Sequence, residues 1–327
     1  MPRHARIDIP GLLHHVIVRG IEKRPVFLDD QDREEFLSRF SLLLKETSTE
    51  CFAWALLDSH FHLLLKPDTV KLAHFMRRLL TGYAVVFNLR HGRAGHLFQN
   101  RYKSIVCDSD SYLLELVRYI HLNPIRAGIA ATLEDLAGYP WCGQRELLGK
   151  MSRKLINEAE VLSLFAPQRM TARKRYERYI ADGIATPANV KLSAGGKRTS
   201  QAFDSRLGND ELFDDRILGG GLFVEQVLKA AEIATKAPEL SLADLIGRVA
   251  EYYRIERTRL SKPSKERDIA RAKATICYLA VRELGLRGID VSAALACTPA
   301  AVSHAAKRGE AVFREEQGLR ERLGMKL

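Results

Sequence analysis

Two histidines stand two residues apart in the run Leu57-Asp58-Ser59-His60-Phe61-His62-Leu63-Leu64-Leu65-Lys66. Side chains alternate between the two faces of a β-strand, so a strand here directs His60 and His62 to one face and the intervening apolar side chains to the other. Imidazole is the commonest metal-binding side chain in proteins. The pair therefore provides half of a metal site. Because a bare His-x-His pair can equally be incidental, the rest of the chain has to provide the remaining parts.

A second group of reactive side chains follows in Tyr119-Ile120-His121-Leu122-Asn123-Pro124. Residues four apart share one face of a helix, so Tyr119 and Asn123 lie one turn from each other. By itself such a tyrosine is more often a half-buried core residue, and an asparagine before proline is often a helix cap. Beside two imidazoles, however, a phenol and an amide oxygen complete a coherent reactive set, because a bound metal ion can activate a weak phenol nucleophile.

The elements that must position these groups follow from the pattern of apolar residues. His14 and His15 in the first strand are adjacent, so they face opposite ways, and we interpret both as structural. The order strand–helix–strand–strand–helix–strand–helix predicts an α+β domain with a ferredoxin-like antiparallel sheet and helices on one face. The predicted segments are a strand over 13–20, a helix from Asp29-Asp30 to about Thr47, a hairpin of strands 52–57 and 60–66, a helix over about 70–89, a strand-like run over 96–106 and a helix over about 112–122 that Pro124 stops.

Length and composition set the broad class. A chain of 327 residues is too long for one typical core, so two or three domains are expected. The net charge of +11 favours a polyanionic partner. We expect no membrane association, because no apolar run approaches a membrane span and the N-terminus has no signal-peptide core. The five cysteines are scattered without a Cys-x-x-Cys pair, which suits a reducing cytoplasm.

Three separated motifs also occur together in one order: His60-Phe61-His62, then Gly95-His96-Leu97-Phe98-Gln99-Asn100-Arg101, then the Tyr119–Pro124 run. Together they resemble the single-tyrosine, His-hydrophobic-His transposases. More closely, they resemble the REP-associated tyrosine transposases. The resemblance covers roughly residues 1–130, and three motifs in order are far more specific than the histidine pair alone.

The resemblance implies a metal-dependent enzyme that cuts and rejoins DNA strands. By it, His60 and His62 bind one divalent ion, Mg²⁺ or Mn²⁺, and Asn123 is the third metal ligand. Tyr119 is the catalytic nucleophile, whose attack gives a 5′-phosphotyrosine and a free 3′-OH. Hard Mg²⁺ usually prefers oxygen ligands, so two imidazoles also suit Mn²⁺.

Single-stranded DNA needs a basic groove with stacking surfaces. The candidate rings are Tyr102 and His96, and the alternation of a strand would put Gln99, Arg101 and Lys103 on one face. The alternative for each basic residue is an ordinary solvated face. The nucleic-acid-binding candidates in this domain are Arg19, Lys66, Arg101, Lys103 and Arg126.

The rest of the chain divides into three parts: a helical extension over 131–185, a linker over 186–235 and an all-α domain over 236–327. In the last part, two short helices over 289–295 and 299–307 flank the turn Ala296-Cys297-Thr298, which favours a helix-turn-helix. This region is similar to the DNA-binding domain of the replication initiator DnaA, although Thr298–His304 lacks the acidic-His-Thr-Thr run of that family. The candidate contacts, to phosphates more than to bases, are Arg267, Arg271, Ser303, His304 and Lys307.

We therefore predict a DNA transposase, a single-strand endonuclease and ligase acting on single-stranded or hairpin DNA, with duplex DNA bound by the C-terminal domain. One alternative is a catalytically inactive, sequence-specific DNA-binding regulator. Another is a hydrolytic metal nuclease, for which Tyr119 would be dispensable. We expect a bacterial, cytoplasmic, nucleoid-associated protein, and the long tail favours a domesticated chromosomal copy over a mobile-element transposase. The sequence leaves open whether it is a monomer or a homodimer.

Overall fold

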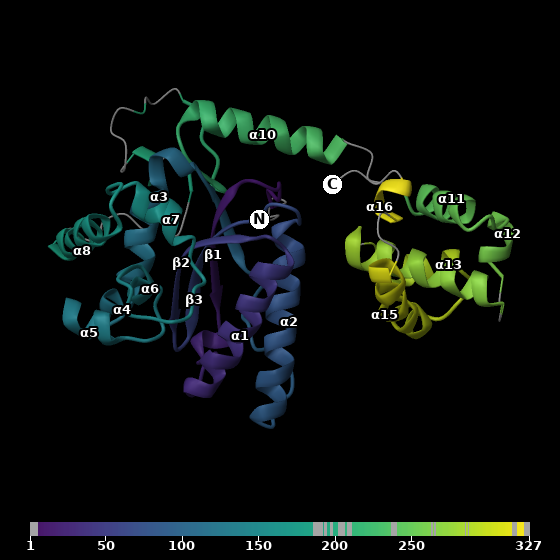
Figure 1. Ribbon diagram of the computed structural model, residues 1–327, viewed down its shortest axis with the longest axis horizontal. Coiled ribbons are helices and arrows are strands. Elements are labelled where there is room, and N and C mark those ends of the chain that lie inside the picture. Colours follow the sequence, from purple (N-terminus) through teal and green to yellow (C-terminus); the bar gives the residue numbers. More distant parts are fainter. Residues whose placement is uncertain are drawn as a thin grey trace. The chain divides into compact units, whose positions relative to one another are not determined.

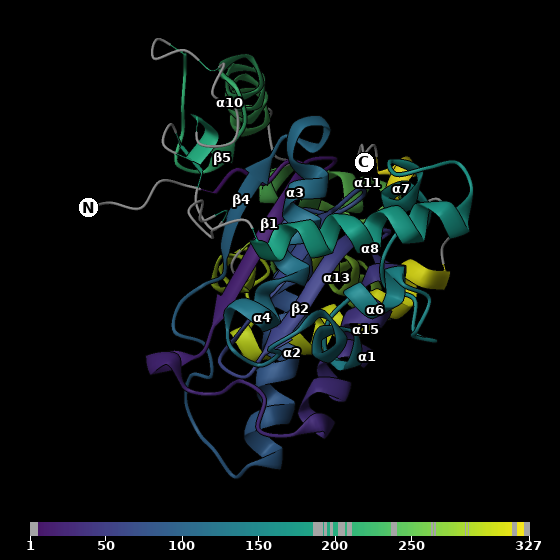
Figure 2. The same cartoon turned by 90° about the vertical axis from the view of Figure 1, so that its left-hand side faces the viewer.

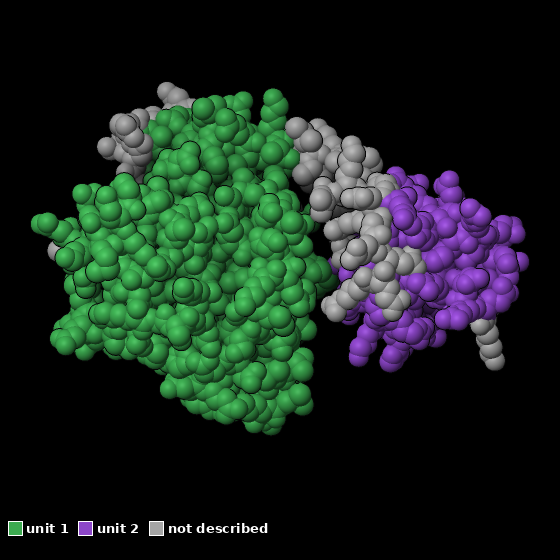
Figure 3. Space-filling view, in the orientation of Figure 1, with its two compact units in different colours: residues 1–234 green, residues 235–327 purple. Residues whose placement is uncertain are grey.

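The computed structural model describes residues 6–185, 192, 195–196, 199–201, 207, 211–236, 241–262, 264, 266–284, 286, 288–315 and 319–323. Much of the predicted linker over 186–235 therefore lies outside the described residues. The chain forms two compact units, residues 1–234 and 235–327 (Figure 3). Within the described residues, no helix combines the length and the apolar character that crossing a membrane requires.

The first unit is built on one sheet with the order β2-β3-β1-β4-β5. The pairs β2–β3, β3–β1 and β1–β4 are antiparallel. Two helices connect them, so the chain runs β1-α1-β2-β3-α2-β4, which is the ferredoxin-like arrangement expected from the sequence. The elements are β1 (Leu13–Arg19), η1 (Ile21–Lys23), α1 (Asp30–Glu46), β2 (Glu50–Leu57), β3 (His60–Lys66), α2 (Leu72–Arg90) and β4 (Lys103–Cys107).

Local sequence explains where these elements begin. The carboxylate of Asp29 accepts a hydrogen bond from the backbone N–H of Asp32, which caps α1. The carboxylate of Asp8 does the same for the first turn of α2, accepting from the backbone N–H groups of Leu72 and Ala73. Asp58 and Ser59 form the two-residue turn of the β2–β3 hairpin.

Helices cover both faces of the sheet, which corrects the expectation that they lie on one face. Phe61 packs against Phe36 of α1, with ring centroids 4.7 Å apart. Its neighbour His62 points the other way, toward Tyr119 on the following helix, α3 (Ser109–His121). Figure 1 shows α1 and α2 on one side of the sheet and α3 on the other, and Figure 2 gives the view turned by 90°. The fold therefore places the histidine face under a helix.

The helical extension joins the core of this first unit. Trp141, Leu147, Val161 and Tyr176 are buried in the same hydrophobic cluster as the sheet. This extension contains α4 (Asn123–Arg126), α5 (Leu133–Gly138), α6 (Gln144–Leu147), α7 (Glu158–Ser163) and α8 (Arg169–Ala185). Within 186–235, β5 (Ile217–Leu218) pairs in parallel with β4, and α10 (Gly221–Lys236) follows it. The stretch expected as a linker therefore contributes a strand to the sheet of the first unit.

Within its described residues, the regular elements of the second unit are helices. Its core is a separate cluster in which α13 and α15 are the principal pair. Ser241 caps its first helix by accepting a hydrogen bond from the backbone N–H of Asp244. Its elements are α11 (Leu242–Tyr252), α12 (Arg257–Leu260), α13 (Arg267–Tyr278), η2 (Leu279–Glu283), α14 (Gly288–Ala294), α15 (Pro299–Glu315) and α16 (Leu319–Arg322).

Candidate functional site

The histidine pair lies on the middle of the sheet, on the face that α3 covers. His60 is opposite Arg19 and His62 is opposite Ile17 in the register of β3 with β1. The two imidazole rings are 5.4 Å apart between centroids. His60 is half-buried, whereas His62 is only 4% exposed. One ring therefore stands at the rim of the site and the other at its floor.

Both imidazoles are held in the neutral form at neutral pH. Burial lowers the pKa of His60, and the nearby positive charge of Arg19 lowers it further. The pKa of His62 is lowered well below its usual value by burial, with smaller contributions from His15, His60 and Arg19. A neutral imidazole keeps a lone pair on one ring nitrogen, which is the form that binds metals. Two such rings side by side fit a divalent cation.

Tyr119 faces the histidines from α3. The carboxylate of Asp108 caps this helix, and the buried side chains of Leu116, Val117 and Ile120 hold it on the sheet. Tyr119 is half-buried, and its ring lies edge-on to that of His62 with 6.1 Å between centroids. The phenol is thus next to the proposed metal ligands rather than inside the core.

Asn123 turns out to be a helix cap as well as a candidate ligand. α3 ends at His121, and Asn123 is the first residue of the short helix α4. Its Nδ2 donates to the backbone oxygen of Tyr119 at 3.0 Å and, more weakly, to that of Ile120 at 3.4 Å. These contacts leave Oδ1 as the amide atom suited to a cation, because metals bind the carbonyl oxygen of an amide. The two roles use different atoms and are compatible.

His15 is a member of the site that the sequence interpretation missed. Its Nε2 lies 3.0 Å from Nδ1 of His62, and its ring centroid is 5.8 Å from that of Tyr119. Burial lowers the pKa of His15 to about 4. His14, its neighbour, is also fully buried but on the opposite face. Ile17 is opposite His62 in the antiparallel pairing of β1 with β3, and His15 lies two residues from Ile17 on the same face. This pairing is the signal that could have revealed His15 as a member of the site.

The basic candidates fall into two groups. Arg19 and Lys103 are exposed residues on the face of the sheet that carries the histidines. Arg19 is opposite His60 in the pairing of β1 with β3, and Lys103 is opposite Ile17, the partner of His62, in the pairing of β4 with β1. Lys66 is at the other end of β3, about 20 Å from His60 by strand geometry, and forms an ion pair with Glu50. Arg101 precedes β4, which begins only at Lys103, so strand alternation does not place it on that face. Lys66 is therefore remote from the histidines along the strand, and Arg101 lies outside β4.

Arg126 contacts the proposed nucleophile directly. Its guanidinium carbon lies 4.8 Å from the centroid of the Tyr119 ring, and its Nη1 donates to the backbone oxygen of Tyr119 at 3.3 Å. A guanidinium over an aromatic face is a favourable cation–π contact. The positive charge is therefore held beside the phenol from the turn that follows α3.

The expected stacking surfaces are not both available. Tyr102 is 7% exposed, and the guanidinium of Arg6 lies over its ring at 4.1 Å. The predicted stacking of a base on Tyr102 is therefore wrong for this arrangement. His96 is exposed and lines a cavity of about 610 Å³ beside α2, with Phe98 and Asn88.

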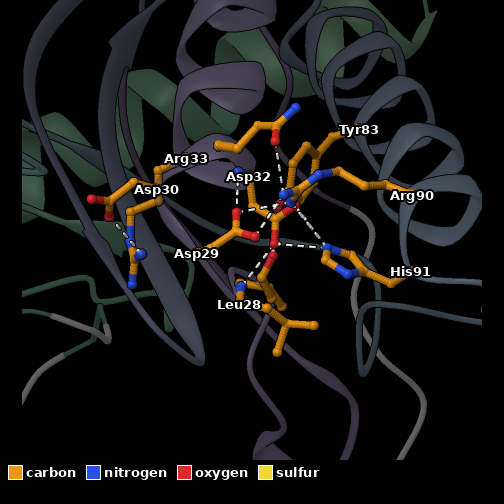
Figure 4. A network of polar contacts seen from close by, with 10 residues as sticks. Leu28, Asp29, Asp30, Asp32, Arg33, Tyr83, Arg90 and His91 are labelled. Atoms are coloured by element: carbon orange, nitrogen blue, oxygen red, sulfur yellow. Dashed lines mark hydrogen bonds and ion pairs between the residues drawn. The ribbon is translucent and has the colours of Figure 1, made fainter.

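A second cluster of possible metal ligands lies far from the histidine pair along the chain, at Asp29, Asp32 and His91 (Figure 4). The guanidinium of Arg90 donates to both carboxylates, to Asp32 at 2.5 Å and to Asp29 at 2.6 Å. His91 Nε2 is 2.9 Å from the Asp32 carboxylate. A cation therefore already occupies the centre of this cluster, so we interpret it as a clamp between the start of α1 and the end of α2.

In the second unit, the candidate DNA contacts lie on α13 and α15. Arg267 is exposed at the start of α13, and Arg271 is half-buried one turn later. Ser303, His304 and Lys307 are all exposed on α15, whose buried side packs on α13. α14 and α15 bracket the predicted turn, and α15 continues to Glu315, beyond the predicted end at residue 307.

The fold and the site together define a ferredoxin-like domain with a His-hydrophobic-His strand facing a helix-borne tyrosine. Residues 9–123 match the family described as "Transposase IS200 like". This part of the chain is therefore similar to IS200-like transposases, and it contains the motifs singled out in the sequence. The match includes His60, His62, Tyr119 and Asn123, and it ends before Arg126.

Among solved structures, the chain is similar to one titled "Structure of the REP associates tyrosine transposase bound to a REP hairpin". The two are 16% identical, the likeness covers 47% of this chain and 90% of that chain, and the TM-score is 0.39. No curated protein matches the sequence significantly. The resemblance of residues 236–327 to the DnaA domain remains a prediction.

Proposed function

We propose that this protein is a DNA transesterase that cleaves and rejoins single-stranded or hairpin DNA through Tyr119. The observation that carries the proposal is the position of the Tyr119 ring. Its centroid is 6.1 Å from the centroid of the His62 ring and 4.8 Å from the guanidinium carbon of Arg126. A phenol, two neutral imidazoles and a fixed positive charge are brought together on one face of the sheet. This combination suits phosphoryl transfer, which depends chiefly on positioning and charge stabilisation.

In the proposed reaction, the oxygen of Tyr119 attacks the scissile phosphorus and the bond from phosphorus to the 3′ oxygen breaks. The products are a 5′-phosphotyrosine and a 3′-OH, which takes up a proton as the phenol loses one. The number of phosphate ester bonds is unchanged, so the reverse reaction rejoins a strand. Arg126 and Arg19 carry positive charge on the side where the phosphate must lie, which favours the developing negative charge.

We infer that His60, His62 and Oδ1 of Asn123 hold one divalent cation, Mg²⁺ or Mn²⁺. When bound, such an ion acts as a Lewis acid that polarises the phosphate and stabilises its negative charge. Two imidazoles and one amide oxygen suit Mn²⁺ better than Mg²⁺, because Mg²⁺ prefers oxygen ligands. The low pKa values of both histidines support this assignment, since a cation and a proton compete for the same lone pair.

We further infer that the second unit binds duplex DNA and tethers the catalytic domain to it, in the nucleoid of a bacterial cytoplasm. The exposed side chains of Ser303, His304 and Lys307 lie along one helix, and Arg267 and Arg271 begin the helix that packs against it. Phosphate contacts release counterions, so binding that depends on these cations weakens steeply with salt. Deleting residues after 235 should lower duplex affinity and its salt dependence while strand cleavage is kept.

The test of the chemistry uses hairpin oligonucleotides labelled at the 5′ or the 3′ end, incubated with the full chain and Mn²⁺. We expect an adduct on a denaturing gel that carries the DNA on the 3′ side of the cut and that disappears in Tyr119→Phe. Tyr112→Phe is the matched control, because Tyr112 is buried two turns earlier on the same helix and its hydroxyl donates to the backbone oxygen of Ser200 at 3.5 Å. Cleavage by Tyr119→Phe at the wild-type rate would show hydrolysis instead, and DNA binding without any adduct in the wild type would show a regulator.

A further inference from the structure

A hydrogen-bonded relay runs from the backbone of residue 192 to the proposed metal ligand. His15 Nδ1 lies 2.8 Å from the backbone oxygen of Leu192, and His15 Nε2 lies 3.0 Å from Nδ1 of His62. His15 is fully buried and His62 is nearly so. Every link is therefore protected from water, and each nitrogen in the relay has one defined partner.

The chemistry of these groups fixes where the hydrogens lie. A carbonyl oxygen only accepts hydrogen bonds, so Nδ1 of His15 carries the hydrogen. A neutral imidazole has one N–H, so Nε2 of His15 is an acceptor and His62 must donate to it from Nδ1. His62 then carries its lone pair on Nε2.

We propose that His15, oriented by the Leu192 carbonyl, is a positioning residue that holds His62 in the tautomer whose Nε2 binds the metal ion. The proposal rests on the proposed function for the identity of His62 as a ligand. Metal-binding histidines generally donate their other N–H to a fixed acceptor, which sets the ring orientation and raises its basicity as a ligand. Here the acceptor is a second imidazole instead of a carboxylate, so the site acquires no extra negative charge.

The ring geometry agrees with this role. The planes of His15 and His62 are inclined by only 28°, with 5.2 Å between centroids, so the hydrogen bond lies close to both ring planes. Leu192 itself is buried, which fixes its carbonyl against β1. A residue from the stretch beyond α8 thereby becomes part of the support of the catalytic site.

The first test is the tautomer of His62 in the metal-free full chain labelled with ¹⁵N-histidine. Long-range proton–nitrogen correlation spectra distinguish a protonated ring nitrogen from an unprotonated one. His62→Gln identifies the His62 signals. We expect His62 to carry its hydrogen on Nδ1, and His15 likewise. A hydrogen on Nε2 of His62 overturns the proposal, whatever the activity of the protein.

The second test is Mn²⁺ affinity, measured by the loss of the free-ion electron paramagnetic resonance signal without DNA. Removing a residue that orients a metal ligand typically costs about 10–100-fold in affinity, so we expect that loss in His15→Phe. His15→Gln should recover part of it, because its amide can accept from His62 and donate to Leu192. His14→Phe is the matched control, since His14 is equally buried on the other face, and it should keep wild-type affinity.

The outcomes separate this inference from the proposed function. If His15→Phe binds Mn²⁺ with the wild-type affinity, the positioning role is overturned but the metal site is kept. Wild-type protein that binds no Mn²⁺ through His60 and His62 contradicts the metal part of the proposed function, and the nitrogen spectrum then decides the tautomer alone. Equal losses in His14→Phe and His15→Phe indicate a packing effect and overturn the proposal.

Discussion

The guanidinium of Arg126 lies over the ring of Tyr119 and also donates to the backbone oxygen of the same residue. One side chain therefore fixes both the ring and the end of the helix that carries it. Because Arg126 follows Tyr119 by two turns and sits on a separate short helix, the contact also ties α4 to α3. The positive charge beside the phenol is thus a built part of the site.

This contact predicts a graded loss of cleavage. Arg126→Ala should slow adduct formation about 100-fold, the scale of losing one charged donor at a developing anion. Arg126→Lys keeps the charge but loses the planar contact with the ring, so its rate should fall between those of the alanine variant and the wild type. Single-turnover formation of the covalent adduct measures both. Arg118→Ala is the control, because Arg118 makes a similar contact with the ring of Tyr179 instead of that of Tyr119; equal rates in all four proteins would refute the role.

The clamp around Asp32 predicts a loss of stability without a loss of metal binding. Asp32 is 2% exposed and accepts from Arg90, His91 and the backbone N–H of Leu28. Asp32→Asn should lower the free energy of unfolding by about 3 kcal/mol, because it leaves buried donors and a cation without their charged partner. Urea unfolding measures this. Mn²⁺ affinity should stay at the wild-type value, since Arg90 already fills the cluster.

The control for this clamp is Asp30→Asn, one residue from the Asp29 cap. Asp30 is exposed and pairs only with Arg33 among the ion pairs of the described chain, at 3.3 Å. Exposed pairs contribute little, so we expect a change under about 1 kcal/mol. If Asp32→Asn instead abolishes Mn²⁺ binding while the chain stays folded, the metal site has been assigned to the wrong cluster.

The buried carboxyl of Glu146 predicts a pH dependence of stability. It accepts from the backbone N–H groups of Leu155 and Ile156, at 2.5 and 2.6 Å, and burial raises its pKa to about 7. Because the raised pKa favours the protonated carboxyl in the folded state, the stability it provides is complete below pH about 4.5 and is lost as pH rises to about 7. Comparing Glu146→Gln with the wild type in urea should show a difference that changes by on the order of 3 kcal/mol over this range. A constant difference would contradict the raised pKa.

The turn before α15 predicts a stabilising substitution. Ala296 has φ of +48°, a left-handed conformation that a side chain disfavours and glycine adopts freely. Ala296→Gly should therefore stabilise the second unit by about 1 kcal/mol. Ala293→Gly, in the exposed face of α14 three residues earlier, should destabilise it by a similar amount because glycine weakens a helix. Amide hydrogen exchange in α13 of the full chain measures both, and changes of the same sign would refute the argument.

The sequence was sufficient for the parts of the site that depend on short-range periodicity. His60 and His62 share a strand face, and Tyr119 lies on the helix that follows the fourth strand, because alternation and helical spacing determine both. Three features of the site and the fold were not predicted from the sequence. His15 joins the site only through the pairing of β1 with β3, a long-range contact. The residues before Lys103 do not continue the strand, which removes Arg101 from the expected face.

The third feature is the second helix layer, which places α3 opposite α1 and α2. Apolar residues on both faces of the central strands are compatible with one helix layer or two, because periodicity shows burial without showing what covers it. Asn123 illustrates the same limit at one residue: its type and spacing suit a cap and a ligand equally, and only the contacts of Nδ2 separate the two roles by atom.

The bond between His15 and the Leu192 carbonyl joins residues 177 positions apart. During synthesis at about 5–20 residues per second, the ribosome takes roughly 10–35 s to travel between them. For most of that interval the nascent chain already contains His60 and His62, and later Tyr119. It still lacks the Leu192 carbonyl that is proposed to orient His62 through His15. The completion of the proposed site therefore waits for the translation of a segment that contains none of its proposed reactive groups.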